Sequence, residues 1–410
     1  MELIDRVQEI MKRAVDTKSV AGVNLLVRVN DEEILYAEEG FADIEKKKPM
    51  RRDTIFRMFS MSKPVTSAAT MILFERGLID LLEPVGDYLP SFKHMRVFDG
   101  NTVKPCERPI FIRDLLDMTA GLSYPDGSTP TGIMVDEVFK ELDGRLRTDH
   151  EMTTRELADR LAAIPLDFEP ESNFKYSTCA DILGALIEEV SGMKYSEFLK
   201  KEIFDPLGME DTGFFVPAEK LDRLASGYQT LEAEDGTRSL RKYDWNNLGI
   251  NNIPDHAPGF ESGGAGLVST LDDYARFTQM LLNEGELDGA RILSPSTVRF
   301  MTGRRLEEHE QKMFVKRMMC YQGFTYSNLL RICIDEDKAG YICSDGEYGW
   351  DGWLGTYMAN LPYEGVSILM GTQKVDSGTF DLTRKLRNVI LTEILADEDA
   401  EFYLDEEEED

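Results

Sequence analysis

Ser60 and Lys63 have the residue types and the spacing of a nucleophile and its base. Three positions apart on a helix, their side chains lie on one face and within hydrogen-bonding reach. A serine hydroxyl is a weak nucleophile until a neighbouring base takes its proton, and a lysine can do so when burial lowers its pKa. Apolar residues crowd the stretch from Val65 to Leu73, so the amine is expected to be buried. The pair therefore predicts a nucleophilic serine activated by a neutral lysine.

A structural alternative for this pair is a serine near a helix start and a lysine whose amine reaches solvent. Ser62, two positions from Ser60, is expected to point elsewhere and to act as a cap or packing residue. Other catalytic motifs are missing from the sequence. It has no G-x-S-x-G elbow, its four histidines are isolated, and the glycine-rich stretch 263–270 lacks the pattern of a phosphate loop. We expect neither a metal ion nor a cofactor.

The elements around this pair alternate between strand and helix patterns. Apolar and polar residues alternate on both sides of Asn30-Asp31, which predicts a β-hairpin, and the helix that carries Lys63 is expected to close near Gly77. Residues 78–214 are helical and rich in loops, and the stretches 112–123 and 178–192 are each expected to form a helix that ends at a glycine. Strand patterns return afterwards, with two strands in 355–371 and a long amphipathic helix in 380–396. Strands at both ends with helices between them predict an α/β unit interrupted by a helical insert.

Composition limits the partners of the protein. The 410 residues carry a formal net charge of −30, which argues against nucleic acid or an anionic membrane as a partner. No apolar run approaches the roughly 20 residues needed to span a bilayer, and the N-terminus lacks the features of a secretory signal. The five cysteines are scattered and odd in number, as in reduced thiols that fill a core. These features predict a cytoplasmic protein; its oligomeric state is not determined by the sequence.

The nucleophile region resembles a known family over a long stretch. "DTIFRMFSMSKPVTSAATMILFERGLIDLLEPVGDYLPSF" is similar to the corresponding region of the serine β-lactamase-like family, which includes class C β-lactamases, D-alanyl-D-alanine peptidases and family VIII carboxylesterases. Further matches follow in family order: "IRDLLDMTAGLS", "FEPESNFKYSTCADILGALIEEVSGMKYSEFLKKEIFDPLGMEDTGF", "GGAGLVSTLDDYARF" and "YGWDGWLGTYM". The resemblance spans residues 20–395 and is strongest to the esterase branch.

The resemblance implies an α+β fold, in which an antiparallel sheet is flanked by helices and a helical domain is inserted. The active site would lie in the cleft between the two parts. On this basis residues 1–77 and 215–396 are expected to form a discontinuous α/β domain, and residues 78–214 the helical domain. Residues 397–410 are rich in acidic side chains and are expected to form a disordered tail.

The resemblance also implies further site residues. Tyr176 matches the tyrosine that helps to move the proton between nucleophile, lysine and leaving group. Thr178 is expected to contact the substrate, and it stands where the family has an asparagine that contacts the acyl-side amide of β-lactams, so the amide contact of that asparagine is not expected here. Tyr124 lies where family members build a wall of the cleft, and it is expected to contact the substrate. A core tyrosine with a satisfied hydroxyl is the alternative for Tyr176.

The third family motif departs from that of penicillin-recognising relatives. These relatives carry Lys-Thr-Gly on the strand beside the site, where the cation and hydroxyl bind the substrate carboxylate. Here the segment is Trp350-Asp351-Gly352, similar to the W-x-G form of the esterases. Trp350 is expected to form an apolar wall, or else to pack in the core, and Asp351 to repel a carboxylate if it faces the cleft. Gly352 would allow close approach of the substrate, and the backbone N–H groups of Ser60 and Trp353 would form the oxyanion hole.

These features predict a serine hydrolase that cleaves neutral carboxylic esters through an acyl-enzyme on Ser60. A β-lactamase, a D-amino-acid peptidase or an acyltransferase on the same fold is the alternative. The missing Lys-Thr-Gly motif argues against the first two. A non-catalytic binding protein on this scaffold is a third hypothesis, against which the presence of Ser60, Lys63 and Tyr176 together argues. The identity of the acyl and alcohol parts of a substrate is not encoded in any of these motifs.

Overall fold

A computed structural model describes residues 2–100 and 102–407 of the chain, with side chains as far as residue 396. Its centre is an antiparallel sheet of eight strands in the order β12-β13-β14-β15-β16-β1-β2-β3. These strands are β1 (Gly22–Val29), β2 (Glu32–Asp43), β3 (Lys48–Pro49), β12 (Phe324–Ser327), β13 (Leu330–Cys333), β14 (Tyr348–Asp351), β15 (Tyr357–Leu361) and β16 (Val366–Thr372). The predicted α+β class with an antiparallel sheet is confirmed.

The hairpin between β1 and β2 turns where the sequence predicts it. Asn30 and Asp31 both have positive φ, of 47° and 68°, as the tight turn between two twisted strands requires. The second predicted hairpin is also present, because β15 and β16 pair antiparallel with Leu361 opposite Val366. Pairing of β1 with β16 joins the two ends of the chain into one sheet. Two neighbouring strands of the sheet, β16 and β1, are therefore more than three hundred residues apart in the sequence.

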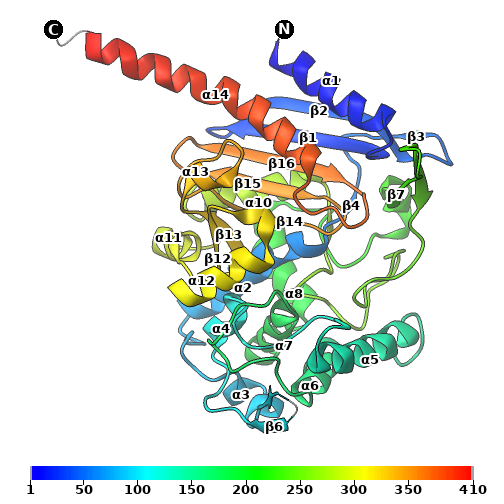
Figure 1. Ribbon diagram of the computed structural model, residues 1–410, viewed down its shortest axis with the longest axis vertical. Coiled ribbons are helices and arrows are strands. Elements are labelled where there is room, and N and C mark those ends of the chain that lie inside the picture. Colours follow the sequence, from blue (N-terminus) through cyan, green and yellow to red (C-terminus); the bar gives the residue numbers. More distant parts are fainter. Residues whose placement is uncertain (1, 101, 408–410) are drawn as a thin grey trace.

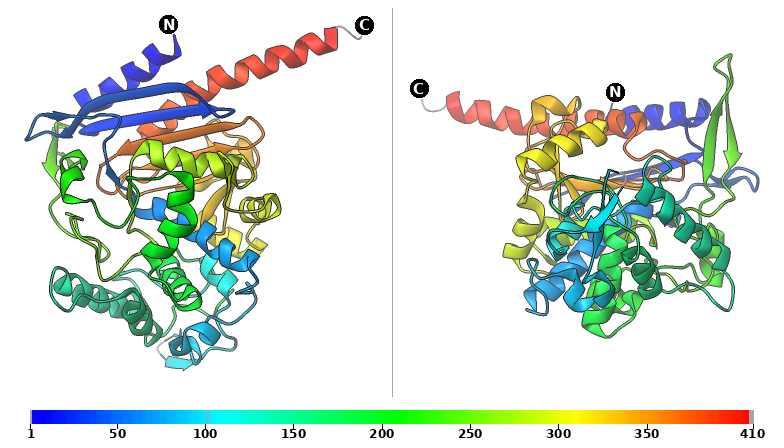
Figure 2. Two further views of the ribbon diagram at one scale, coloured as in Figure 1. Left: turned by 180° about the vertical axis from the view of Figure 1, so that it is seen from behind. Right: turned by 60° about the horizontal axis from the view of Figure 1, so that its bottom comes forward.

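The two faces of the sheet are covered by different helices (Figures 1 and 2). The terminal helices α1 (Leu3–Asp16) and α14 (Asp381–Glu407) pack side by side on the outer face, over a core that includes Val7, Met11 and Leu386. α10 (Leu271–Leu282) covers the inner face against β15 and β16. On that inner side the core continues without a break into the helical part of the molecule.

The helix that carries Lys63, α2 (Ser62–Glu75), runs beneath the sheet and packs on both β14 and α7. The helices of the lower part are α3 (Val85–Tyr88), α4 (Ile112–Leu116), α5 (Pro130–Arg145), α6 (Thr154–Ala162), α7 (Cys179–Ser191), α8 (Tyr195–Leu199) and α9 (Asp205–Leu207), with single turns η2 (Pro90–Phe92) and η3 (Lys200–Phe204). Gly77 and Gly192, both with positive φ, follow α2 and α7 as predicted. The prediction that the helix beginning at Ile112 ends at a glycine is wrong, because α4 already ends at Leu116.

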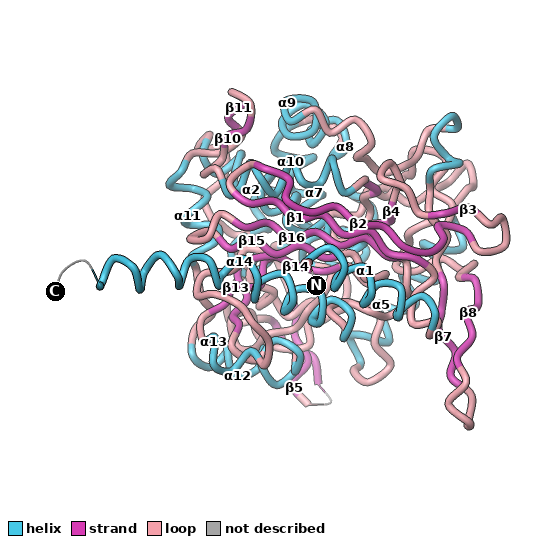
Figure 3. The backbone as a smooth tube through the Cα atoms, turned by 90° about the horizontal axis from the view of Figure 1, so that it is seen from above, coloured by secondary structure: helices cyan, strands magenta, loops and turns pink. Residues whose placement is uncertain are grey.

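The remaining elements lie at the edges of these layers. They are β4 (Phe56–Arg57) paired with β9 (Val268–Ser269), β5 (Arg96–Asp99) with β6 (Thr102–Pro105), β7 (Tyr228–Glu232) with β8 (Arg238–Lys242), and β10 (Glu286–Leu287) with β11 (Ala290–Arg291). The helices are α11 (Pro295–Gly303), α12 (Glu308–Arg317) and α13 (Glu336–Ala339), with η1 (Phe59–Met61), η4 (Ala218–Arg223) and η5 (Met319–Tyr321). Seen from above, the β7–β8 hairpin and the end of α14 project from the body (Figure 3).

The domain division stays a prediction, since one continuous core links the sheet to the helices of residues 78–214. The expected boundary at residue 396 does not coincide with the end of a helix, because α14 runs on to Glu407. Residues 408–410 of the predicted acidic tail lie outside the described residues, and the disorder of that tail stays a prediction. Among the helices that the structure describes, none is both long and apolar enough to cross a membrane.

Candidate active site

Ser60 lies in the short turn η1, which joins the edge strand β4 to α2. Phe59, directly before it, has a φ of 46°, which is rare for a residue with a large side chain and costs conformational energy. The ring of Phe59 packs against Trp353 at 5.1 Å between ring centroids, and this packing holds the strained residue in place. Ser62 is buried and its hydroxyl accepts a hydrogen bond from the Leu267 amide at 3.0 Å. The packing role predicted for Ser62 is confirmed.

Lys63 is fully buried behind Ser60. Its Nζ lies 3.3 Å from Ser60 Oγ and donates to Tyr124 Oη at 3.1 Å and to the Gly264 carbonyl at 2.9 Å. Burial lowers the pKa of Lys63 to about 7, and the nearby carboxyl groups of Asp181 and Asp351 only partly oppose this shift. The structure therefore excludes the alternative in which the amine reaches solvent, and it gives the lysine the low pKa that a base near neutral pH needs.

Asp181 and Gly264 hold the lysine in place, and no motif in the sequence points to this role for either residue. The Asp181 carboxylate is buried and accepts hydrogen bonds from the Ser262 hydroxyl at 2.5 Å and from the Gly264 amide at 3.0 Å. These bonds fix the loop whose Gly264 carbonyl receives the Lys63 amine. A side chain at Gly264 would meet the Tyr124 hydroxyl at 2.8 Å and displace it, so the glycine lets this hydroxyl stay beside the lysine. The glycine-rich stretch was visible in the sequence, but its contact with the lysine was not.

Tyr176 lies beside both members of the pair. Its ring centroid is 4.5 Å from Lys63 Nζ, and its hydroxyl accepts a hydrogen bond from the Trp350 indole Nε1 at 3.1 Å. Burial raises the pKa of Tyr176 well above its usual value, and hydrogen bonding to Ser60 and Trp350 opposes that rise. The tyrosine is therefore neutral at ordinary pH and can pass a proton on, as its predicted role requires.

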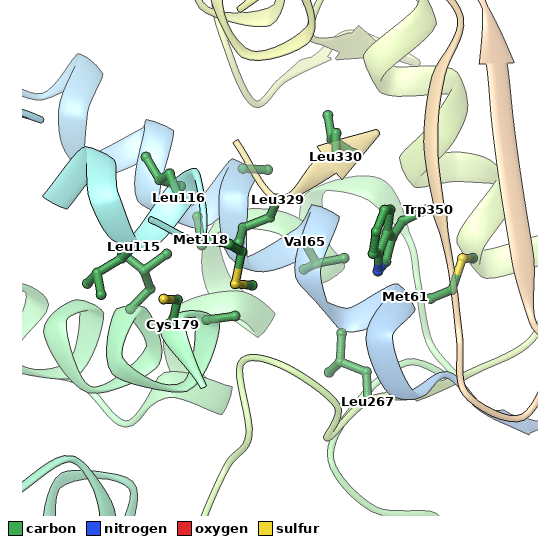
Figure 4. Close-up of a cluster of buried hydrophobic side chains, with 14 of the residues drawn as sticks. Met61, Val65, Leu115, Leu116, Met118, Cys179, Leu267, Leu329, Leu330 and Trp350 are labelled. Atoms are coloured by element: carbon green, nitrogen blue, oxygen red, sulfur yellow. The ribbon is translucent and has the colours of Figure 1, made fainter. Parts of the chain in front are cut away.

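Trp350 is a core residue as well as a partner of Tyr176. It is 1% exposed, so the prediction of an open apolar wall is wrong, and the alternative of core packing holds. Figure 4 shows its ring beside Val65 and Met61, under the strand that carries Leu330. The indole needs a hydrogen-bond acceptor in this apolar setting, and the Tyr176 hydroxyl supplies it.

Tyr124 and Thr178 differ in how well they fit their expected contact with the substrate. Tyr124 is half-buried, and its hydroxyl accepts from Lys63, so it belongs to the surroundings of the base rather than to a simple wall. Thr178 is fully buried, and its hydroxyl donates to the Ser123 carbonyl at 3.4 Å. A contact of Thr178 with substrate is therefore not supported, because packing at the start of α7 closes it off.

Asp351 does not face the cleft. Its carboxylate is buried and accepts hydrogen bonds from the Thr379 hydroxyl at 2.6 Å and from the Tyr321 hydroxyl. Burial raises the pKa of Asp351 to about 6, and Lys63 partly opposes this shift. The conditional prediction of repulsion by Asp351 thus fails, because the side chain points into the protein and ties the end of β14 to the segments around it.

Gly352 and Trp353 turn the chain back at the end of β14. A side chain at Gly352 would meet the Met58 carbonyl at 2.3 Å. This glycine therefore allows its strand to lie close to the segment just before the nucleophile. The Gly355 amide donates to the Gly352 carbonyl at 2.8 Å and closes a tight turn with Trp353 inside it. Among the backbone hydrogen bonds of the described residues, none uses the Trp353 amide. This leaves the amide available for an oxyanion, and its pairing with the Ser60 amide stays a prediction.

Trp350→Phe tests the link between the indole and Tyr176. Phenylalanine keeps an aromatic ring in the core but loses the N–H group that donates to the Tyr176 hydroxyl. A neutral hydrogen bond contributes about 0.5–1.5 kcal/mol, so we expect kcat for a good substrate to fall about two- to tenfold. Steady-state kinetics of the variant, with thermal unfolding as a check on folding, measure this effect.

Tyr326→Phe is the matched control for that substitution. The Tyr326 ring packs on Trp350 at 5.0 Å between centroids, and its buried hydroxyl has no hydrogen-bond partner within the part of the chain that the structure describes. Its removal is expected to leave kcat within about twofold of the parent enzyme. Equal losses in the two variants would mean that packing, and not the indole N–H, supports Tyr176.

Within residues 2–100 and 102–396, no three histidine, cysteine, aspartate or glutamate side chains are grouped so as to bind a metal ion. What the site offers instead is a half-buried serine hydroxyl, a buried lysine with a lowered pKa and two tyrosine hydroxyls within reach of them. Such a set of groups can move a proton from a nucleophile to a leaving group.

Comparison with known proteins agrees with this geometry. The model of the family described as Beta-lactamase matches residues 7–391, which is most of the chain. The protein therefore belongs to the beta-lactamase family and has the fold of β-lactamases and penicillin-binding proteins. The resemblance expected from the sequence motifs is confirmed.

Individual relatives narrow the class of enzyme. The chain is 31% identical over 361 residues to "Protein Rv1367c" of Mycobacterium tuberculosis, covering 86% of this chain and 85% of that protein. It is 32% identical over 290 residues to "Esterase EstB" of Burkholderia gladioli, covering 67% and 69%. The solved structure of "EstCE1, a hydrolase with promiscuous acyltransferase activity" matches with a TM-score of 0.79 and 26% identity, over 95% of this chain and 98% of that one. The chain is accordingly an enzyme of the serine hydrolase and acyltransferase class within this family.

Proposed function

We propose that the protein hydrolyses neutral carboxylic esters through an acyl-enzyme on Ser60. The observation that carries this proposal is the buried Lys63 amine, which lies between the Ser60 hydroxyl and the Tyr124 hydroxyl with a lowered pKa. Esterase activity in a relative at 32% identity supports the same class of substrate. A non-catalytic binding protein would have no need for a desolvated amine beside a serine.

The first half of the reaction forms the acyl-enzyme. Ser60 Oγ attacks the ester carbonyl while its proton passes to the neutral Lys63 amine, and the carbonyl oxygen gains negative charge. The backbone N–H groups of Ser60 and Trp353 would stabilise that oxyanion; one such donor is worth about 3 kcal/mol in a transition state. As the tetrahedral intermediate collapses, the carbon–oxygen bond to the alcohol breaks. The proton returns through the Tyr176 hydroxyl to the leaving alkoxide, which departs as the alcohol.

The second half releases the acyl group. A water molecule attacks the acyl carbonyl, gives its proton to the same lysine and tyrosine pair, and the Ser60 oxygen leaves and is reprotonated. An alcohol in place of water would yield a new ester, so acyl transfer needs no change in the machinery. The relative with promiscuous acyltransferase activity makes this a second candidate activity.

The substrate preference follows from the strand beside the site. Penicillin-type substrates carry a carboxylate, which is bound well by a cation or a charge-assisted donor. Residues 350–353 offer two tryptophans, a buried aspartate and a glycine instead. The missing charge-assisted hydrogen bond is worth about 1.5–3 kcal/mol. We therefore expect kcat/KM for a short-chain p-nitrophenyl ester to exceed that for a chromogenic cephalosporin by about 10- to 10²-fold.

A screen of p-nitrophenyl esters of rising chain length, with the cephalosporin alongside, measures this preference. Each substrate is also incubated with the Ser60→Ala variant, so that hydrolysis without the nucleophile is subtracted. Addition of a small alcohol to the ester reactions, with product analysis by mass spectrometry, separates transfer from hydrolysis. A higher kcat/KM for the cephalosporin would overturn the esterase proposal in favour of the β-lactamase alternative.

A further inference from the structure

Two cysteines far from the nucleophile lie in direct contact. Cys333 is the last residue of β13, and Cys343 follows the short helix α13. Their Sγ atoms are 3.5 Å apart, and both side chains are buried, with Cys343 6% exposed and Cys333 fully buried. They are ten positions apart in the sequence, without the close spacing of a redox motif, so the pair is visible only in the structure.

The backbone holds both thiols firmly in this position. The Cys333 amide donates to the Glu347 carbonyl at 2.7 Å, and the Cys333 carbonyl accepts from the Gly346 amide at 3.1 Å. On the other side the Ile342 amide donates to the Asn388 side chain at 3.0 Å. Hydrogen bonds thus anchor the chain on both sides of the contact, and the sulfur atoms must move from 3.5 Å to the bonding distance of about 2.05 Å.

Two buried arginines lie beside the carboxylate of Glu347, next to the cysteine pair. Arg331, two residues before Cys333 on the same face of β13, is fully buried near Glu347, and its Nε and Nη1 groups have no hydrogen-bond partner within the described residues. Arg387 forms a buried ion pair with the same Glu347 carboxylate. Two guanidinium groups therefore share one carboxylate. The hydrogen bond between the two thiols lowers the pKa of Cys333, while burial and the carboxylates of Glu347 and Glu336 oppose this shift. A thiolate is the reactive form of cysteine.

We propose that Cys333 and Cys343 are an oxidation site, at which a small peroxide closes them into a reversible intramolecular disulfide. One thiol loses its proton and its sulfur attacks an oxygen of hydrogen peroxide; the O–O bond breaks, the sulfur becomes a sulfenic acid, and the leaving hydroxide takes up the proton and departs as water. The second thiol then loses its proton and attacks the sulfenic sulfur; the S–S bond forms, the S–O bond breaks, and the hydroxide leaves with that proton as a second water. The two sulfur atoms lose two electrons in total and the peroxide gains them. A thiol reductant reverses the step and restores both cysteines.

Peptide mapping of the intact protein tests this proposal. The full chain is treated with hydrogen peroxide, denatured in the presence of an alkylating reagent, and digested without reductant. The expected result is a cross-linked species that joins the peptides of Cys333 and Cys343, lighter than their sum by two hydrogen atoms, which disappears after treatment with a phosphine reductant. Alkylation of both cysteines at peroxide concentrations that already oxidise the exposed Cys320 would overturn the proposal.

Two variants make the result specific. Cys320→Ser removes the exposed thiol and is expected to form the same cross-link, which excludes exchange through Cys320 as its origin. Cys343→Ser is expected to lose the cross-link and to leave Cys333 open to alkylation or to further oxidation. In the Cys320→Ser background the oxidised protein should also unfold at a temperature about 2–4 °C higher than the reduced protein. The mapping of the parent protein stands on its own if either variant fails to fold. A cross-link that persists in Cys343→Ser would assign the site to another pair.

Discussion

Ser60→Ala is expected to lower kcat/KM for the best ester substrate by about 10⁴-fold or more. The substitution removes the only oxygen that the proposed mechanism uses to form the acyl-enzyme, and loss of a nucleophile in serine hydrolases has effects of this size. The side chain is half-buried in a short turn, so removal of its hydroxyl is not expected to disturb the fold. Initial rates with a p-nitrophenyl ester, corrected for spontaneous hydrolysis, give the ratio.

A covalent probe shows whether Ser60 itself is acylated. Intact-mass measurement after treatment with a fluorophosphonate should show one adduct, mapped to the peptide that contains Ser60. Ser67→Ala is the matched control, because Ser67 is a buried serine of the adjoining helix α2 whose hydroxyl has no hydrogen-bond partner in the described part of the chain. It is expected to keep full activity and the full adduct. An adduct on Ser62, or full esterase activity in Ser60→Ala, would refute the assignment.

Lys63→Arg is expected to reduce kcat by about 10²- to 10⁴-fold. A guanidinium group stays protonated in proteins, so it cannot accept the Ser60 proton, and general-base catalysis contributes about this much. Arginine is also larger than the fully enclosed site allows. Lys63→Ala separates these two reasons, since it leaves room in place of the amine. Partial rescue of Lys63→Ala by a small primary amine is expected if the missing base is the cause of the loss.

The pH dependence of the parent enzyme gives a second test of the same lysine. Burial lowers the pKa of Lys63 to about 7, and only the neutral amine can act as base. The fraction of neutral amine grows as the pH rises through this value, so kcat/KM should increase with pH through about 7 and then level off. Lys175→Arg, which exchanges a lysine that forms ion pairs with Asp126 and Asp167, is expected to keep both the rate and this profile. A parent profile that is flat between pH 5 and 9 would mean that Lys63 does not titrate during the reaction.

Most of the fold could be predicted because its signals are local. Alternating side chains predict the strands β1 and β2, a second pair of strand patterns predicts β15 and β16, and Asn30-Asp31 has the residue types that its tight turn requires. The helix boundary near Gly77 follows from the same kind of short-range pattern. The error at Leu116 has a local cause as well. Met118 takes a positive φ of 59° and ends that helix early, a conformation that a methionine rarely adopts and that no sequence pattern announces.

In the candidate site, too, only the features with a local signal could be predicted from the sequence. The Ser60 and Lys63 spacing, and the motif at Tyr176, were sufficient to find the central groups, because a helix places residues three apart on one face whatever surrounds it. Their surroundings were not predictable. The Lys63 amine donates hydrogen bonds to Tyr124, 61 positions away in the sequence, and to Gly264, 201 positions away. The burial of Asp351 depends on its contacts with Thr379 and Tyr321.

By itself, the sequence of this protein determined the reactive pair, the strand and helix patterns and the family. Only the tertiary structure decided that Trp350 donates to Tyr176, that Asp351 points inward and that Cys333 meets Cys343. The physical reason is that spacing along the chain fixes which neighbours a residue has within one helix or strand. The burial of a charge, and therefore its pKa, depends on segments that are brought together only when the sheet and the helices pack.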